Sequence, residues 1–274
     1  MPRRSWKPIV ARAKAIVDSY ELPVTLRQLF YRLVVEALID NSTYCYRRLS
    51  EVTAIARRAG AFPDLADLTR EIVRYQTWAD PTDAQDWLAE HYRIDRTEGQ
   101  PYAVYLSIEK HALSTLLLDR FGDRGIPILP LGGYSSQTFV DDVVRDVEAR
   151  RDDRRAILLL ATDFDPSGED LARDFEVRTG CFDKVIRVAL TAEQVAEYQV
   201  PESVAPEKTD PDQTKDSRAK HFLGKYGRLR QAELDALPPD LLLTLFEDAL
   251  VPFWDASAFE DACAREDDDR LDLA

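Results

Sequence analysis

In the first sixty residues, apolar positions recur every three or four residues, which is the period of a helix with one buried face. The pattern predicts three helices, over residues 5–19, from about residue 25, and from about residue 42 to residue 60. Thr25 and Gln28 have the spacing of a capping box, and Gly60 is a helix-stop signal. Two short helices in sequence are typical of helix-turn-helix and winged-helix DNA-binding modules.

Beyond residue 100 the apolar positions form short continuous runs, which are typical of strands buried on both faces. The runs predict four strands, at residues 102–108, 126–131, 156–161 and 184–190. Helical periodicity between successive runs requires parallel strands with helices on the faces of the sheet. The sequence therefore predicts an α/β fold, with a helical, winged-helix-like domain over residues 1–98 and a Rossmann-like domain over residues 99–274. Residues 61–100 are expected to form a wing or a connector.

Composition indicates a globular protein of ordinary kind. The chain has 274 residues, of which 45% are hydrophobic and 31% charged, and no apolar run approaches the length of a membrane span. The beginning of the chain lacks the apolar region of a signal peptide. Its three cysteines have neither metal-ligand nor disulfide spacing. We therefore expect a cytoplasmic, nucleoid-associated protein without a membrane partner.

Charge is distributed unevenly along the chain, although the net charge is −14. Residues 1–60 hold eleven Lys and Arg against five Asp and Glu, whereas the remainder holds 25 against 45. This asymmetry favours a basic DNA-binding module joined to an acidic one. The last fourteen residues hold six acids and two arginines, and are expected to be a solvated acidic tail.

Four arginines on the third predicted helix are the candidate contacts to double-stranded DNA. Arg47 and Arg58 return to nearly the same angle on its outer side, and Arg48 and Arg57 lie on the flanks. Such side chains neutralise backbone phosphates. The alternative is that they only solvate an outer helix face.

On the second predicted helix, Arg27 and Tyr31 stand four residues apart and are expected on one exposed side. A tyrosine beside an arginine can attack a phosphodiester while the guanidinium holds the phosphate. The alternative interpretation is a half-buried tyrosine that only packs.

Three acids follow the ends of predicted strands: Glu109 after the first, and Asp163 and Asp165 after the third. Ligands of open α/β sheets bind at the carboxyl ends of the strands, so these acids are expected to converge. Because no basic run lies nearby in sequence, a cation should offset their repulsion, and Mg²⁺ suits such oxygen ligands. The alternative is that both aspartates serve as turn and N-cap residues. Glu233 and Asp235 also have metal-ligand spacing, but they are interpreted as an amphipathic helix surface.

These motifs resemble those of a known family. Glu109 and the pair Asp163 and Asp165 resemble the acids of a Toprim domain. The segment Asp163-Phe-Asp-Pro-Ser-Gly is similar to the DxDPxG segment of the topoisomerase VI A subunit and of the related meiotic double-strand-break protein. The segment Arg27-Gln-Leu-Phe-Tyr31 is similar to the arginine and paired aromatics of that family, with Phe30 in place of the first tyrosine. The resemblance covers about two-thirds of the chain, which looks like a short, stand-alone relative.

The resemblance implies a winged-helix domain ahead of a Toprim domain, and a DNA-cleaving enzyme of the type IIB topoisomerase A kind. Tyr31 would form a 5′-phosphotyrosyl link, with Arg27 beside it and Mg²⁺ held by Glu109, Asp163 and Asp165. In this family the tyrosine of one subunit works with the metal site of the other, which implies a homodimer. The chain lacks GxGxxG, so ATP-driven strand passage would need a separate ATPase subunit.

Two other functions stay open at this point. The chain could be a Toprim nuclease in which water replaces Tyr31 as the nucleophile. It could also be a non-catalytic DNA-binding subunit of a plasmid, phage or defence assembly, with structural acids.

Overall fold

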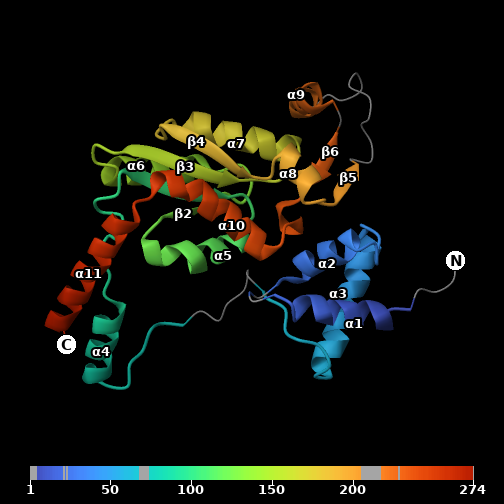
Figure 1. Cartoon of the computed structure of the whole chain (residues 1–274), viewed down its shortest axis with the longest axis horizontal. Coiled ribbons are helices and arrows are strands. Elements are labelled where there is room, and N and C mark those ends of the chain that lie inside the picture. Colours follow the sequence, from blue (N-terminus) through green and yellow to red (C-terminus); the bar gives the residue numbers. More distant parts are fainter. Residues whose placement is uncertain are drawn as a thin grey trace.

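The computed structural model describes residues 5–20, 22, 24–67, 74–204, 217–227 and 229–273. Figure 1 shows a helical module near the N-terminus and a central sheet with helices on both faces. The C-terminal helix lies beside the helix α4 (Pro81–His91). In the described part of the chain, no helix combines the length and apolar character needed to cross a membrane.

The helical module contains the three helices that the apolar pattern predicts, namely α1 (Lys7–Val17), α2 (Leu26–Val35) and α3 (Thr43–Arg58). The capping box is confirmed: the Gln28 amide donates to Thr25 Oγ1 at 3.2 Å, and Gln28 Oε1 accepts from the Thr25 amide at 2.8 Å. At the start of α3, Ser42 Oγ accepts from the amide of Cys45. These caps satisfy amide groups that a helix leaves without internal partners, which is why local sequence located both helix starts.

The sheet has four parallel strands in the order β2-β1-β3-β4. Their bounds are β1 Tyr102–Ile108, β2 Ile128–Pro130, β3 Arg155–Ala161 and β4 Lys184–Ala189. The α/β prediction is confirmed at this level, although β2 pairs over three residues and is shorter than expected.

Helices cover both faces of the sheet (Figure 1). On one face lie α5 (His111–Phe121) and α10 (Pro239–Leu250), whose buried residues cluster with Leu106 of β1 and Leu159 of β3. On the other face lie α6 (Gln137–Arg150) and α7 (Pro166–Thr179), clustered with Tyr105 and Leu158. Successive strand residues alternate between the two clusters, so each strand is buried on both sides.

The direction of winding reverses between β1 and β3. The chain passes from β1 to β2 on one side, and then returns across β1 to place β3 on the other. At such a switch point the carboxyl ends of two neighbouring strands open into a crevice that commonly holds ligands. Glu109 and Asp163 follow these two strand ends, and the Glu109 amide donates to the carbonyl of Ala161 at 2.9 Å.

A C-terminal segment covers the end of β3. Its elements are α8 (Ala192–Glu197), β5 (Glu202–Val204), α9 (Ser217–Tyr226), β6 (Arg230–Ala232) and the 3₁₀ turn η2 (Leu234–Ala236). Phe164 and Ala232 exchange backbone hydrogen bonds of 2.9 and 3.0 Å. The ring of Phe164 packs against Phe222 and Tyr226 of α9. These contacts place η2 beside the strand-end acids.

The remaining elements of the described chain are two helices and two 3₁₀ turns. They are α4 (Pro81–His91), the 3₁₀ turns η1 (Gly122–Arg124) and η3 (Val251–Phe253), and α11 (Ala256–Leu273). Residues 61–67 and 74–100 contain α4 and one isolated bridge, between Thr25 and Ala66, with no pair of strands that would form a wing. Helix α4 lies beside α11.

The expected solvated acidic tail forms the last part of α11, and most of its described residues are exposed. Glu266 is fully buried, and its carboxylate accepts hydrogen bonds from Arg96, Arg270 and the Ile94 amide. The other five acids of the last fourteen residues are exposed, as expected of a solvated segment. Glu266 is the exception, because arginines more than 150 positions away in sequence or one turn away on the helix can neutralise a buried acid.

Candidate functional site

Two of the three predicted acids lie together at the switch point. Glu109 Oε2 accepts from the Asp163 amide at 2.9 Å. Asp163, which is 6% exposed, accepts from the Leu234 amide through Oδ1 at 2.8 Å. Its other oxygen, Oδ2, lies 2.6 Å from the ammonium of Lys110. The carboxylates therefore converge as their strand-end positions predict, and Asp163 also joins η2 to the sheet.

Asp165 serves as the N-cap of α7. Its Oδ1 accepts from the Gly168 amide at 2.7 Å, and Pro166 occupies the first helical position. The capping interpretation therefore holds for this residue. Its negative charge nevertheless reaches the site, because it contributes to the raised pKa of Glu109.

Gly168 allows α7 to start directly against the end of β3. A Cβ atom at this position would lie 2.2 Å from the carbonyl oxygen of Asp163. Atoms cannot approach so closely, so any side chain here would push Asp163 and the first turn of α7 apart. The glycine of the DxDPxG-like segment is thus required by packing, whatever chemistry the acids perform.

Lys110 is the positive charge that sequence inspection overlooked. It lies between β1 and α5, and its Nζ is close to Asp163 and 3.5 Å from Glu233. Burial lowers the pKa of this ammonium, but the hydrogen bond to Asp163 and the charges of Asp163, Asp235 and Glu109 together outweigh burial, so the pKa is raised. Inspection for basic runs alone missed this single lysine, although it directly follows Glu109.

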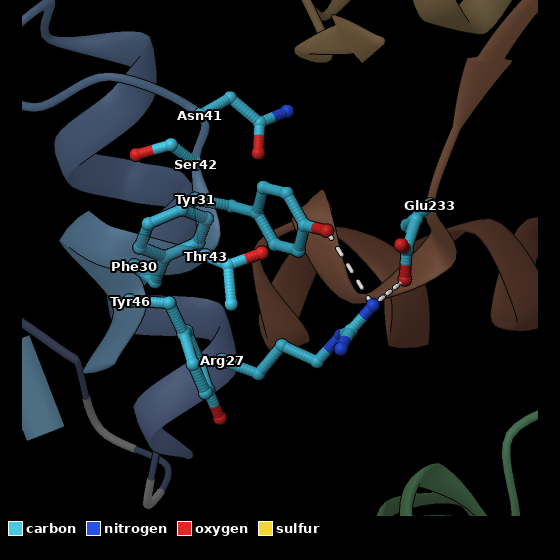
Figure 2. Close-up of a pocket in the computed structure, with 8 residues that line it drawn as sticks. All are labelled: Arg27, Phe30, Tyr31, Asn41, Ser42, Thr43, Tyr46 and Glu233. Carbon is cyan, nitrogen blue, oxygen red and sulfur yellow. Dashed lines mark hydrogen bonds and ion pairs between the residues drawn. The ribbon is translucent and has the colours of Figure 1, made fainter. Parts of the chain in front are cut away.

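Tyr31 is 6% exposed, so the expectation of an open helix face was wrong. The outer side of α2 is covered by η2, which the helical period of α2 alone does not reveal. Arg27 Nη2 lies 3.5 Å from the Tyr31 hydroxyl, which is the long limit of a hydrogen bond. The same guanidinium pairs with Glu233, and its Nε lies 3.1 Å from Asp235 Oδ2. Figure 2 shows the Tyr31 hydroxyl and the Glu233 carboxylate both directed at the same nitrogen of the Arg27 guanidinium.

The pKa of the Tyr31 hydroxyl is raised above its ordinary value, chiefly by burial. Positive charge on Arg27 and Lys110 opposes this rise, while Asp235 and Asp163 add to it. Charges from the sheet domain thus act on a hydroxyl of the helical module. Within one chain, Asp163 and Asp235 therefore influence the pKa of this tyrosine.

A cavity of about 280 Å³ lies beside Tyr31. Its lining is largely polar and comes from α2, the start of α3 and the residue before η2: Arg27, Phe30, Tyr31, Asn41, Ser42, Thr43, Tyr46 and Glu233. Phe30 packs edge-on against both Tyr31 and Tyr46, so the phenylalanine restricts the orientation of the Tyr31 ring. Hydroxyl and amide groups, together with the Arg27 guanidinium, can bind an anionic or hydrogen-bonding ligand here.

The four arginines of α3 lie as their angles predict. Arg47 and Arg58 are exposed, whereas Arg48 and Arg57 are partly buried on the flanks. Arg48 pairs with Glu51 at 2.5 Å. None of the four lines the cavity, so a role in binding DNA would be separate from the chemistry at Tyr31.

Glu233 and Asp235 are the site residues that the sequence interpretation missed. Their spacing was noticed but assigned to an exposed helix, whereas they flank Leu234 in a tight 3₁₀ turn. Asp235 is buried, and burial is the main cause of its raised pKa. No pattern within residues 230–236 indicates that this turn contacts α2.

The site carries more negative than positive charge. Five carboxylates (Glu109, Asp163, Asp165, Glu233 and Asp235) face two cations, Arg27 and Lys110, which leaves an excess of three negative charges when all are ionised. Burial, followed by the charge of Asp163, raises the pKa of Glu109. The described residues include no preformed group of three or more His, Cys, Asp or Glu side chains that could hold a metal ion. In charge and ligand type the acids fit Mg²⁺, provided that Lys110 moves away from Asp163.

No protein-family model matches the sequence, and no curated protein matches it.

Proposed function

We propose that this protein cleaves DNA strands by a tyrosine transesterification, as a type IIB topoisomerase A-like enzyme. In this proposal α1–α3 act as the winged-helix-like DNA-binding domain, and the sheet acts as a Toprim domain. The observation that carries the proposal is the position of Tyr31, whose hydroxyl lies beside Arg27 and within the electrostatic reach of Lys110 and Asp163.

The chemistry follows from the groups around that hydroxyl. The Tyr31 oxygen would attack the phosphorus of a DNA phosphodiester and form a phosphotyrosyl bond at the 5′ end. The bond from phosphorus to the 3′ oxygen breaks, and that oxygen takes up a proton in exchange for the one that Tyr31 loses. Arg27 and Lys110 would neutralise the non-bridging oxygens and orient the phosphate.

Glu109, Asp163 and Asp165 are the residues that would hold Mg²⁺. When bound, the ion supplies positive charge to the phosphate and to the leaving oxygen. Asp163 also keeps η2 in place through the Leu234 amide, so it positions Glu233 and Asp235 as well.

A second candidate is a metal-dependent nuclease that uses water. The burial of Tyr31 favours it, because the raised pKa of this hydroxyl makes the phenolate harder to form. In that case Tyr31 packs between Phe30 and Arg27, and its hydroxyl takes no part in the reaction.

Trapping of covalent adducts decides between the two candidates. Labelled supercoiled DNA is incubated with the protein and Mg²⁺, denatured, and examined for DNA attached to protein. Tyr31→Phe should abolish both cleavage and attachment, because no other group has its oxygen at that position. Tyr44→Phe is the matched control, since Tyr44 is 72% exposed and does not line the cavity. If Tyr31→Phe cuts as fast as the wild type, water is the nucleophile.

The partners belong to the same proposal. Double-stranded DNA is the substrate, and the family resemblance favours a homodimer and a separate ATPase subunit.

A further inference from the structure

Glu233 contacts both cations of the site, Arg27 and Lys110. Its carboxylate accepts from the guanidinium of Arg27 and lies 3.5 Å from the ammonium of Lys110. With the described residues it makes no other hydrogen bond or ion pair. An anion supplied by the chain itself thus occupies the position between the two groups best placed to receive a phosphate.

We propose that Glu233 is an internal competitor for the nucleic-acid backbone. In the free protein its carboxylate occupies the phosphate position on Arg27 and Lys110, and a backbone phosphate displaces it when nucleic acid binds. The inference rests on the proposed function only for the identity of the ligand, which is a phosphodiester.

The surroundings of Glu233 allow its side chain to move away from Arg27 and Lys110. Its side chain is 35% exposed and lines the cavity beside Tyr31, so it has open space into which it can rotate. The next residue, Leu234, is fixed by its hydrogen bond to Asp163, so the backbone can stay in place. Because both of its cations are required by a phosphate, the two anions cannot bind fully at the same time.

Asp235 has the opposite character. Its side chain is 9% exposed and contacts Nε, on the other part of the same guanidinium. It can therefore keep Arg27 oriented toward the cavity while Glu233 is exchanged for phosphate. Asp235 positions the arginine permanently, and Glu233 blocks it until a backbone phosphate takes its place.

The test compares Glu233→Gln with Glu247→Gln. Glu247 is a matched control, because it also contacts two cations, Arg120 and Arg124, and its side chain is 30% exposed. Affinity for a short double-stranded DNA is measured without Mg²⁺, so that no cleavage takes place. Glu233→Gln should bind roughly fivefold more tightly than the wild type, since no ion pair has to be broken first, whereas the control should change less than about twofold.

A double variant tests whether the gain in affinity depends on Arg27. In an Arg27→Gln background the gain from Glu233→Gln should disappear or shrink markedly, because the shared cation is gone. Equal affinities for Glu233→Gln and Glu247→Gln would overturn the inference, as would failure of all these proteins to bind DNA. Adduct trapping reports separately on the nucleophile, so a competitor at Glu233 can be established even if Tyr31 proves not to react.

Discussion

At the scale of single residues, the site is defined by how each acid is satisfied. Asp163 has a partner for each oxygen, an amide for one and Lys110 for the other. Glu109 accepts one amide hydrogen bond and otherwise faces the negative charge of Asp163. The neighbouring carboxylates of Glu109 and Asp163 therefore differ in what their charge does to the stability of the fold.

Neutralising Glu109 should stabilise the protein at neutral pH without metal. Burial and neighbouring acids raise its pKa in the folded state, so the fold favours the protonated form. Its contribution is therefore favourable below the pKa of an ordinary glutamate and is lost as pH rises through the raised folded pKa. Glu109→Gln should melt at a higher temperature than the wild type at neutral pH, and the advantage should vanish in acid.

Asp163→Asn provides the contrast for that experiment. It removes the ion pair with Lys110, so the same calorimetry should show a lower melting temperature. Mg²⁺ should raise the melting temperature of the wild type by binding the folded state. A wild type that does not respond to Mg²⁺, together with a destabilised Glu109→Gln, would make these acids structural.

At the scale of elements, the turn from β3 to α7 decides where the acids lie. It is built from an N-cap at Asp165, a proline at the first helical position and a glycine in close contact with Asp163. The N-cap and the proline are local rules of helix starts, and together with the glycine they place Asp163 at the switch point while Asp165 caps α7.

Gly168→Ala should therefore destabilise the protein by about 2–3 kcal/mol through overpacking. The added methyl group meets backbone atoms of Asp163, which have no flexible end that can move aside. Denaturant unfolding measures the change. Gly224→Ala in α9 is the control, because a Cβ there has nothing within 4 Å, and alanine in a helix interior gains roughly 0.5–1 kcal/mol. Equal effects at the two positions would contradict the packing argument.

The third helix offers a prediction of its own. If Arg47 and Arg58 contact DNA, replacing both with alanine should weaken binding at every sequence. The slope of log affinity against log salt should become shallower by about 0.9 for each phosphate that the protein no longer neutralises. The folded structure should be unaffected, because both side chains are exposed. Unchanged affinity and slope would leave these arginines as a solvated helix face.

At the scale of the whole molecule, the helical module and the sheet share one site. Tyr31 of α2 and Leu234 of η2 belong to the same cluster of buried residues, and Arg27 pairs with Glu233 across the contact. The family resemblance implies that a tyrosine acts on the metal site of a second subunit. In this structure the tyrosine lies beside Arg27, which pairs with Glu233 of the same chain.

Mixing two inactive variants distinguishes these arrangements. Tyr31→Phe and Glu109→Gln are each expected to lack cleavage activity. If the tyrosine works with the acids of its own chain, the mixture should stay inactive, because each chain lacks one component. Restored cleavage and adduct formation in the mixture would show that a homodimer combines the tyrosine of one chain with the acids of the other.

Local sequence by itself determined the elements and their caps. Helix starts at Thr25 and Ser42, the buried strands β1 and β3, and the acids at their carboxyl ends all follow from interactions within a few residues. The parallel direction of the strands followed as well, because strands linked by helices return to the same edge of the sheet, whereas the strand order β2-β1-β3-β4 was not predicted. The basic and acidic parts of the chain were also visible, since composition needs no contacts.

Only the tertiary structure decided which distant segment covers a helix face that looks exposed in the sequence. The burial of Tyr31, the pairing of Lys110 with Asp163 and the docking of Glu233 and Asp235 on Arg27 join residues that are distant in sequence. Glu266 in α11 became a buried acid for the same reason. A periodic pattern reports which side of an element is apolar, but it holds no information about which distant segment brings a compensating charge. Electrostatic pairing depends on distance in space, and that distance exists only once the sheet and the helices have packed together.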